Sequence, residues 1–294
     1  MPVRVAGVRF LNTIPLVDGL AETAGLQWSR DVPSQLHTLL ESGRADIALV
    51  SSIDAARSRT PLAILDAGMI GSEGPTLTVR LFGASRPEQL EEVWLDPDSH
   101  TSAALCRLLL ERRFGARPAF RALAPRGQAA SGERGDAKTP DPSAFPHGPR
   151  TGVLLIGDKV ITGAPPENLF PHQVDLGQAW HEWTGQPFVY AAWMCRADEA
   201  DRPEIALAAA LLDRQRRKNL VRLASLAAEH GPAAGWPVDL AERYLASHLR
   251  FDLGPRERAA AQRFIDECAA LGLCPPAPLR WADWHTTAHA ATRV

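Results

Sequence analysis

Short apolar runs alternate with amphipathic segments through the first 66 residues, and this alternation restricts the chain to a small set of folds. The spacing predicts a strand at 3–8, a helix near 14–22 and a helix at 34–42 with Ser34 as its N-cap. The run DIALV at 46–50 is almost continuously apolar, which is typical of a parallel strand covered on both faces. Repeated strand–helix units predict an α/β fold with a mostly parallel, doubly wound sheet.

Two long apolar strands, expected at 75–85 and 186–195, bracket a central segment of the chain. They indicate two α/β lobes joined by a double-stranded hinge, in which the chain leaves the first lobe and later returns to it. Beyond the second crossing the pattern becomes helical, and these C-terminal helices are expected to pack on the first lobe. The helical stretches are 203–229, 237–249 and 255–271.

The crossings define a domain division. Residues 1–84 and 190–294 are expected to form lobe one, and residues 85–189 to form lobe two. The stretch at about 122–150 is rich in Gly, Pro, Ala and charged residues and has no apolar periodicity. We therefore expect it to be a flexible surface insertion between two strands of lobe two.

Composition excludes several classes of function. The net charge is −2, which gives no electrostatic footprint for nucleic acid, and no run approaches the ~18 apolar residues of a membrane span. With no export signal at the N-terminus, a cytoplasmic protein is expected. The four cysteines form no C-x-x-C pair and have no histidine at ligand spacing, so they are expected to be buried thiols with no metal site.

Short polar residues follow or adjoin the ends of the predicted strands. In open α/β sheets this edge binds ligands, because free N–H groups of helix N-termini gather there. Any one of these residues is explained by helix capping alone, but together they form a set of neutral donors suited to a small carboxylate. The polar residues at these strand ends are Asn12, Thr13, Ser51, Ser52, Thr78, Asp98, Ser99, His100, Thr101, Ser102, Gly157 and Asp158.

Other residues allow two interpretations each. His100 is either a general base or a solvent-facing side chain beside a helix cap, and Asp158 is either an N-cap or a ligand contact. Arg9 and Arg80 either bind a carboxylate of the ligand or point to solvent from alternating strands. Three tryptophans are expected to pack at the hinge instead of forming a stacking platform: Trp180, Trp183 and Trp193.

Several stretches together resemble one family. RFLNTIPLVDGL, PSQLHTLLESGRADIALVSSID, GSEGPTLTVRLFG, LDPDSHTSAALCRLLL, LLIGDKV and DLGQAWHEWTGQPFVYAAW are similar to chorismate dehydratases of the futalosine route to menaquinone. The resemblance runs in order through about residues 3–195. It implies the two-lobed fold of type 2 periplasmic binding proteins and the conversion of chorismate to 3-[(1-carboxyvinyl)oxy]benzoate and water.

The resemblance also implies roles for residues. The family's L-N-T falls on Leu11, Asn12 and Thr13, which makes Asn12 the expected catalytic contact and Thr13 the helix cap. The expected substrate-binding residues are Ser51, Ser52, Thr78, Thr101, Ser102, Gly157 and Asp158. Three positions depart from the family's pattern: Ser51 replaces a proline, His100 an arginine and His181 an aromatic residue.

Chorismate's chemistry indicates a mechanism for such a chain. Loss of the ring proton and then of hydroxide creates a benzene ring, so the protein's main task is to orient the substrate and stabilise charge. No obvious base is present among the residues, and the substrate's enolpyruvyl carboxylate is the expected proton acceptor. A hydro-lyase without metal or organic cofactor is therefore expected.

Two alternatives stay open at this point. One is a non-catalytic protein that binds a small carboxylate, because such a protein would share the same cleft. The other is the sister enzyme of the futalosine pathway that acts on dehypoxanthine futalosine. The sequence does not indicate the oligomeric state.

Overall fold

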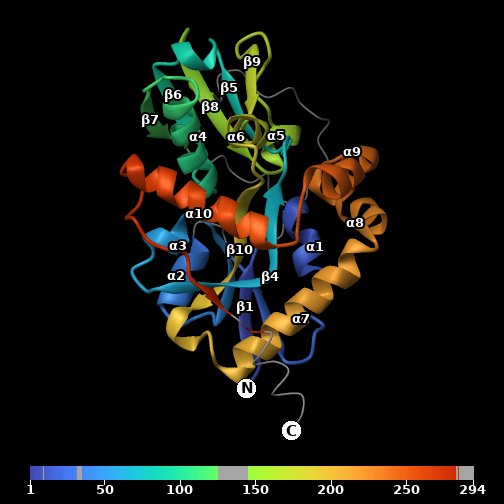
Figure 1. Ribbon diagram of the computed structural model, residues 1–294. Helices are drawn as coiled ribbons and strands as arrows, with labels where there is room; N and C mark the ends of the chain where they lie inside the picture. The colour runs from blue at the N-terminus through green and yellow to red at the C-terminus, as the bar shows by residue number, and fades with distance from the viewer. Residues whose placement is uncertain (9, 32–34, 125–144, 283, 285–294) are drawn as a thin grey trace.

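The chain builds two β-sheets, one above the other in Figure 1, each flanked by helices. The computed structural model describes residues 1–8, 10–31, 35–124, 145–282 and 284. Arg9, Ser34 and most of the 122–150 stretch therefore lie outside the described residues.

The lower sheet has six strands in the order β11-β4-β10-β3-β1-β2. Strand β1 pairs in parallel with β2 and β3, whereas β10 pairs antiparallel with β3 and β4. All five residues of β3 are buried, as expected for a strand covered on both faces. The bounds are β1 (Val3–Gly7), β2 (Leu26–Arg30), β3 (Ile47–Ser51), β4 (Leu62–Ser72), β10 (Phe188–Arg196) and β11 (Trp281–Ala282).

The upper sheet has five strands in the order β7-β6-β8-β5-β9. Strand β6 pairs in parallel with β7 and β8, and β5 pairs antiparallel with β8 and β9. The bounds are β5 (Val79–Gly83), β6 (Glu92–Leu95), β7 (Ala119–Ala122), β8 (Thr151–Ile156) and β9 (His172–Asp175).

Both sheets are mixed, which corrects the expectation of mostly parallel sheets. The antiparallel strands β10 and β5 are the ones next to the crossings, because a chain that returns between two sheets enters them in the opposite direction. Residues 79–83 also belong to the upper sheet, although 1–84 was expected to lie in lobe one. Periodicity identifies a strand here but does not reveal its partner.

Among the residues that the structure describes, six α-helices precede β10. The first is shorter than the predicted 14–22 segment: it ends at Val17, and the buried Asn219 donates from Nδ2 to the carbonyl oxygens of Pro15 and Asp18 just there. These helices are α1 (Ile14–Val17), α2 (Leu36–Glu41), α3 (Asp54–Arg57), α4 (His100–Arg112), α5 (Lys159–Thr162) and α6 (Leu176–Thr184).

The C-terminal helices return to the lower sheet, as expected. Helix α7 packs on β4 and α1, and α10 packs on β10 (Figure 1). The helix expected at 203–229 is two helices that join around Val221, and the segment at 237–249 ends in a π-helical turn at Tyr244–His248. The α-helices are α7 (Pro203–Leu220), α8 (Leu223–His230), α9 (Val238–Arg243) and α10 (Pro255–Ala270).

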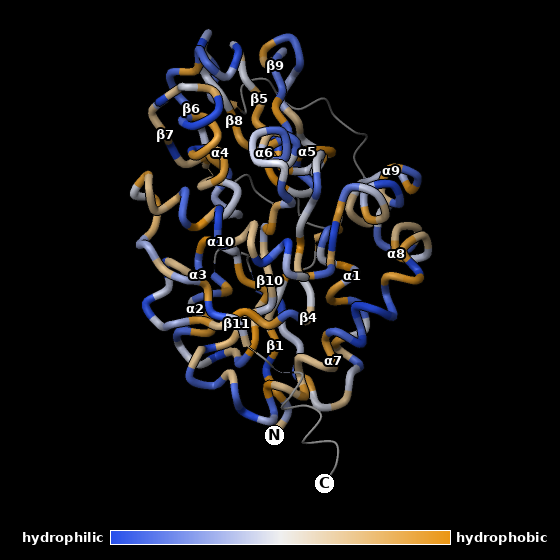
Figure 2. Tube along the Cα trace, in the orientation of Figure 1, coloured by the Kyte–Doolittle hydropathy of each residue, from blue (hydrophilic) through white to orange (hydrophobic). Residues whose placement is uncertain are grey.

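A large apolar core runs through the lower sheet and into one face of the upper sheet. Figure 2 shows hydrophobic colours along β1 and β10 and hydrophilic colours along the outer part of α7. Trp180 and Trp193 are fully buried in this core, and Trp183 packs against it, which supports the packing role expected for the three tryptophans. Trp180 donates from Nε1 to the Pro187 carbonyl beside β10.

The four cysteines are buried free thiols, as expected. Burial raises the pKa of the Cys106, Cys195 and Cys268 thiols to about 12. Within the described ranges, no helix combines the length and the apolar character that a bilayer crossing requires. The cytoplasmic location stays a prediction.

The described ends of the 122–150 stretch are part of the fold, which corrects the expectation that it is entirely surface. Leu123 and Phe145 are buried on the second face of the upper sheet, in a cluster with Val153, Leu155 and Phe170. The rings of Phe145 and Phe170 meet edge to face, with centroids 6.2 Å apart. A region that lacks periodicity can still contribute single anchoring side chains.

Phe145→Ala is expected to destabilise the protein by about 3–5 kcal/mol, because it leaves a cavity at a fully buried position. Urea unfolding followed by circular dichroism would measure the loss. Leu207→Ala is the matched control, since Leu207 is 51% exposed and should change stability by less than about 0.5 kcal/mol. Equal effects of the two substitutions would contradict the packing described for Phe145.

Candidate functional site

A pocket of about 620 Å³, including its mouth, lies between the two sheets. Its walls come from the ends of β1, β3 and β8, from the start of α4 and from the C-terminal segment after α9. The lining residues are Val8, Phe10, Asn12, Thr13, Leu49, Ser51, Ile70, Thr76, Thr78, Val79, Asp98, Ser99, Ser102, Ile156, Gly157, Tyr190, Ala191, Tyr244 and Leu249.

Asn12 stands where β1 has ended, in a 3₁₀ turn at Leu11–Thr13. The Thr13 hydroxyl hydrogen-bonds the carbonyl oxygens of Val8 and Phe10, each at 2.8 Å, which fixes this turn. Thr13 is at the N-cap position of α1, as expected, but its side chain makes no cap bond. The Asn12 side-chain carbonyl oxygen is buried and has no hydrogen-bond partner in the described protein, which leaves it available to a ligand.

Two tyrosines close the pocket from the hinge side. The hydroxyl of Tyr244 lies 2.6 Å from Thr78 Oγ1, and the hydroxyl of Tyr190 lies 2.6 Å from Thr76 Oγ1. Burial raises the pKa of both phenols, so they stay protonated and can act as hydrogen-bond donors. These pairs make the hinge wall polar and neutral.

The start of α4 forms the opposite wall. Ser99 is the N-cap and accepts from the Ser102 N–H at 3.1 Å, and its hydroxyl donates to Ser102 Oγ at 2.9 Å. The positive end of a 13-residue helix dipole therefore lies at this wall. No lysine or arginine lines the pocket among the described residues, and the charge of Asp98 is paired with Lys159 Nζ at 2.7 Å.

Gly157 and Asp158 follow β8 and have different roles. Gly157 lines the pocket with φ +63°, a backbone conformation that favours glycine. Asp158 is not among the lining residues: its Oδ1 accepts from Trp236 Nε1 at 2.9 Å, and it makes no cap bond. Burial raises its pKa, which the hydrogen bonds from Trp236 and from the Leu11 amide oppose. Asp158 thus ties β8 to the turn that carries Asn12.

The predicted serines and threonines separate into two groups. Ser51, Thr78 and Ser102 line the pocket. Ser52 and Thr101 do not line it, because Ser52 donates to the Val189 carbonyl and Thr101 Oγ1 accepts from the Ile53 N–H. Their hydroxyls already have backbone partners, and both residues contribute to the walls only indirectly.

The remaining candidates lie outside the pocket lining. Arg80 donates to Gln173 on β9 at 3.0 Å, and His181 Nδ1 lies 3.3 Å from the Gln186 carbonyl. His100 was interpreted as a base or a solvent-facing residue, but it pairs with the buried Asp54 at 2.9 Å. Asp54 was not singled out in the sequence.

Asp175 holds the connection between the two sheets. Its carboxylate accepts from the N–H groups of Thr76, Leu77 and Gln178, at 2.6–3.1 Å. Leu77 has φ +69°, an unfavourable conformation for leucine that these bonds stabilise. The strained turn places Thr76 and Thr78 on the pocket wall.

Four side chains at or beside the pocket were not predicted from the sequence: Thr76, Tyr190, Trp236 and Tyr244. The tyrosines lie in segments that read as a buried strand and a surface helix, so periodicity gave them a packing role. The one available signal was the rarity of tyrosine, of which the chain has two, both at this pocket.

Comparison with known proteins identifies the family. A family model described as menaquinone biosynthesis matches residues 3–270. A chorismate dehydratase of Thermus thermophilus is 31% identical over 289 residues, which cover 94% of this chain and 97% of that protein. The chain belongs to the chorismate dehydratase family. A second chorismate dehydratase, from Campylobacter jejuni, is 23% identical over 90% of this chain and 92% of its own length.

Solved structures confirm the expected fold of this family member. A structural-genomics protein of Archaeoglobus fulgidus superposes with a TM-score of 0.61 at 16% identity, covering 92% of this chain and 98% of that one. The periplasmic aliphatic sulphonate binding protein of Escherichia coli superposes with a TM-score of 0.56 at 16% identity, covering 95% of this chain and 89% of that one. The periplasmic-binding-protein-like architecture predicted from the sequence is therefore correct.

Gly177→Ala is expected to destabilise the hinge, although alanine normally favours a helix by about 1 kcal/mol. A Cβ at Gly177 would lie 2.0 Å from Thr76 Oγ1 and 2.7 Å from the Gly74 carbonyl, so the turn must shift. Thermal unfolding would report a lower Tm. The double substitution Gly177→Ala/Thr76→Ala should recover part of the loss in Tm. If Gly177→Ala alone had a higher Tm than the unaltered protein, the close approach of residue 177 to Thr76 would be contradicted.

Proposed function

We propose that this protein is a hydro-lyase that converts chorismate to 3-[(1-carboxyvinyl)oxy]benzoate and water in menaquinone biosynthesis. The family membership supports this activity. The observation that carries the proposal is the Asn12 amide, whose oxygen is buried without a partner in a pocket with neutral donors on its walls. A hydroxylated, carboxylate-bearing ring matches that arrangement.

Binding of the substrate carboxylates is proposed to depend on neutral donors. The N-terminus of α4, with the hydroxyl of Ser102, offers dipoles to one carboxylate. Tyr190 and Tyr244 offer phenolic donors from the opposite wall. Because these groups are held by Thr76, Thr78 and Ser99, they need little reorganisation when charge develops on the ring carboxylate.

The proposed reaction is a 1,2-elimination. The ring carbon that bears the enolpyruvyl ether loses its proton, and the electron pair is delocalised into the diene toward the ring carboxylate. Hydroxide then leaves from the adjacent carbon, takes up the proton as water, and a benzene ring remains. Asn12 is proposed to orient the substrate and stabilise the developing charge through its amide.

The proton acceptor is proposed to be the substrate's own enolpyruvyl carboxylate. The lining residues include one carboxylate, Asp98, and it is already paired with the Lys159 ammonium group. No histidine lines the pocket among the described residues. Asp158, whose raised pKa would suit a base, is bonded to Trp236 outside the lining.

Asn12→Ala is expected to lower kcat/KM for chorismate by about 10²-fold or more, as observed when one positioning or charge-stabilising contact is removed. The aromatic product, followed by its absorbance and by chromatography, gives the rate. Arg117→Gln is the control, because the Arg117 side chain is 79% exposed and pairs with Glu111 outside the pocket lining, so this variant should leave the rate unchanged. Full activity of the Asn12 variant would refute the role proposed for Asn12. No turnover of chorismate by the unaltered protein would refute the proposed substrate.

A chorismate analogue with its side-chain carboxylate esterified is expected to bind weakly and to give no aromatic product. The ester lacks the proposed proton acceptor, and saturating concentrations separate this loss from weaker binding. Rapid quench and chromatography would measure product at saturation. Turnover near the rate of chorismate would show that the proton goes to a protein group.

A further inference from the structure

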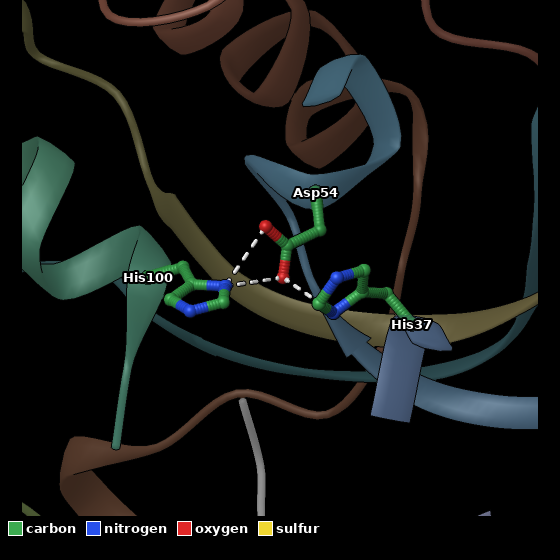
Figure 3. Close-up of side chains that lie close together, drawn as sticks. All are labelled: His37, Asp54 and His100. Atoms are coloured by element: carbon green, nitrogen blue, oxygen red, sulfur yellow. Dashed lines mark hydrogen bonds and ion pairs between the residues drawn. The ribbon is translucent and has the colours of Figure 1, made fainter. Parts of the chain in front are cut away.

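A second group of chemically active side chains lies outside the pocket lining. His37 comes from α2, Asp54 is the first residue of α3, and His100 is the first residue of α4 (Figure 3). The His100 Nδ1 atom lies 2.9 Å from Asp54 Oδ2, and the His37 Nδ1 atom lies 3.8 Å from the same oxygen. Figure 3 shows the two imidazole rings on either side of the carboxylate.

His37 Nδ1 is left without a hydrogen bond in this group. The atom is buried and has no hydrogen-bond partner in the described protein, and 3.8 Å to Asp54 is too long for such a bond. The Asp54 side chain is 3% exposed. A buried nitrogen beside a buried carboxylate is costly unless a further group bonds to both.

The spacing of the three donor atoms fits a metal ion. One nitrogen or oxygen from each residue can be chosen so that all three lie within 4.8 Å of one another. A tetrahedral zinc ion with ligands at about 2.0–2.1 Å keeps neighbouring ligand atoms about 3.3 Å apart, which lies between the two distances to Asp54 Oδ2. Two imidazoles and one carboxylate are a ligand set that zinc-class ions favour.

We propose that His37, Asp54 and His100 form a binding site for a divalent transition metal of the zinc class. The three residues supply three ligands and leave the fourth position open to water. None of them is among the residues that line the pocket, so the ion has no part in the elimination. The proposal revises the expectation of no metal site and is independent of the proposed substrate.

The site joins the two sheets of the molecule. His37 and Asp54 lie in helices that pack on β3 of the lower sheet, whereas His100 begins α4, which contacts β8 of the upper sheet as well as β10 of the lower sheet. The neighbouring residues Ser99 and Ser102 line the pocket. An ion held here would therefore fasten the start of α4 to the lower sheet and stabilise the closed arrangement of the pocket.

Another acidic and histidine-containing group serves as a comparison. Asp18, Glu229 and His230 also lie close enough to share an ion. The Arg222 guanidinium already hydrogen-bonds Asp18, which places a positive charge where the metal would bind, and Glu229 is 62% exposed. This group is expected to bind no ion tightly.

The test uses the full chain after treatment with a chelator and its removal. Titration with Zn²⁺ in a calorimeter should give one site per chain with a Kd in the micromolar range or tighter. At 100 times the Kd, Zn²⁺ should raise Tm by about 4–5 °C. Co²⁺ should give the visible d–d absorption of a four-coordinate N/O site. Binding in the millimolar range only would overturn the proposal.

Substitutions locate the ion. His37→Gln should abolish tight binding and the Tm rise while the apo protein keeps its circular dichroism, because His37 Nδ1 makes no protein hydrogen bond. Asp54→Asn should also abolish binding, and His230→Gln should leave it intact. If Asp54→Asn fails to fold, His37→Gln decides alone. Unchanged binding by His37→Gln, or its loss in His230→Gln, would overturn the proposal.

Discussion

The Asp175 carboxylate is the interaction on which the geometry of the pocket depends. Asp175 is the last residue of β9 and the N-cap of α6. Its carboxylate also accepts hydrogen bonds from the backbone N–H groups of Thr76 and Leu77, in the connection between β4 and β5. These bonds hold Leu77 in a conformation that leucine rarely adopts. The same turn brings the hydroxyls of Thr76 and Thr78 to the two tyrosines. One partly buried carboxylate thus connects the hinge to the wall of the site.

The sequence was most informative where a backbone rule determines the outcome. Polar residues after a strand gather at one edge of a sheet, and Asn12, Ser102 and Gly157 line the pocket as this rule predicts. Ser52 and Thr101 satisfy the same rule but bond to backbone groups instead. A hydroxyl after a strand has two classes of partner, and the choice between them depends on tertiary neighbours that no local pattern contains.

The parts that could not be predicted come from contacts between distant segments. Tyr244 reaches the pocket from the segment after α9, and Trp236, just before α9, bonds Asp158 outside the pocket lining; the periodicity of this region reports only burial. The side chains of His37, Asp54 and His100 come from three separate helices, so they present no ligand spacing along the chain. The direction of β5 and β10 also depended on the route of the chain between two sheets. Local patterns specify the elements well and their partners poorly.

The C-terminal helices attach to the upper sheet at two points, through Tyr244 to Thr78 and through Trp236 to Asp158. Two chain connections join the sheets, one between β4 and β5 and one between α6 and β10. Contacts that lie away from these two connections restrict the rotation of one sheet against the other. These two hydrogen bonds join the C-terminal region to residues next to β5 and β8 of the upper sheet. The C-terminal region therefore acts as a brace that sets the mechanical stiffness of the closed molecule.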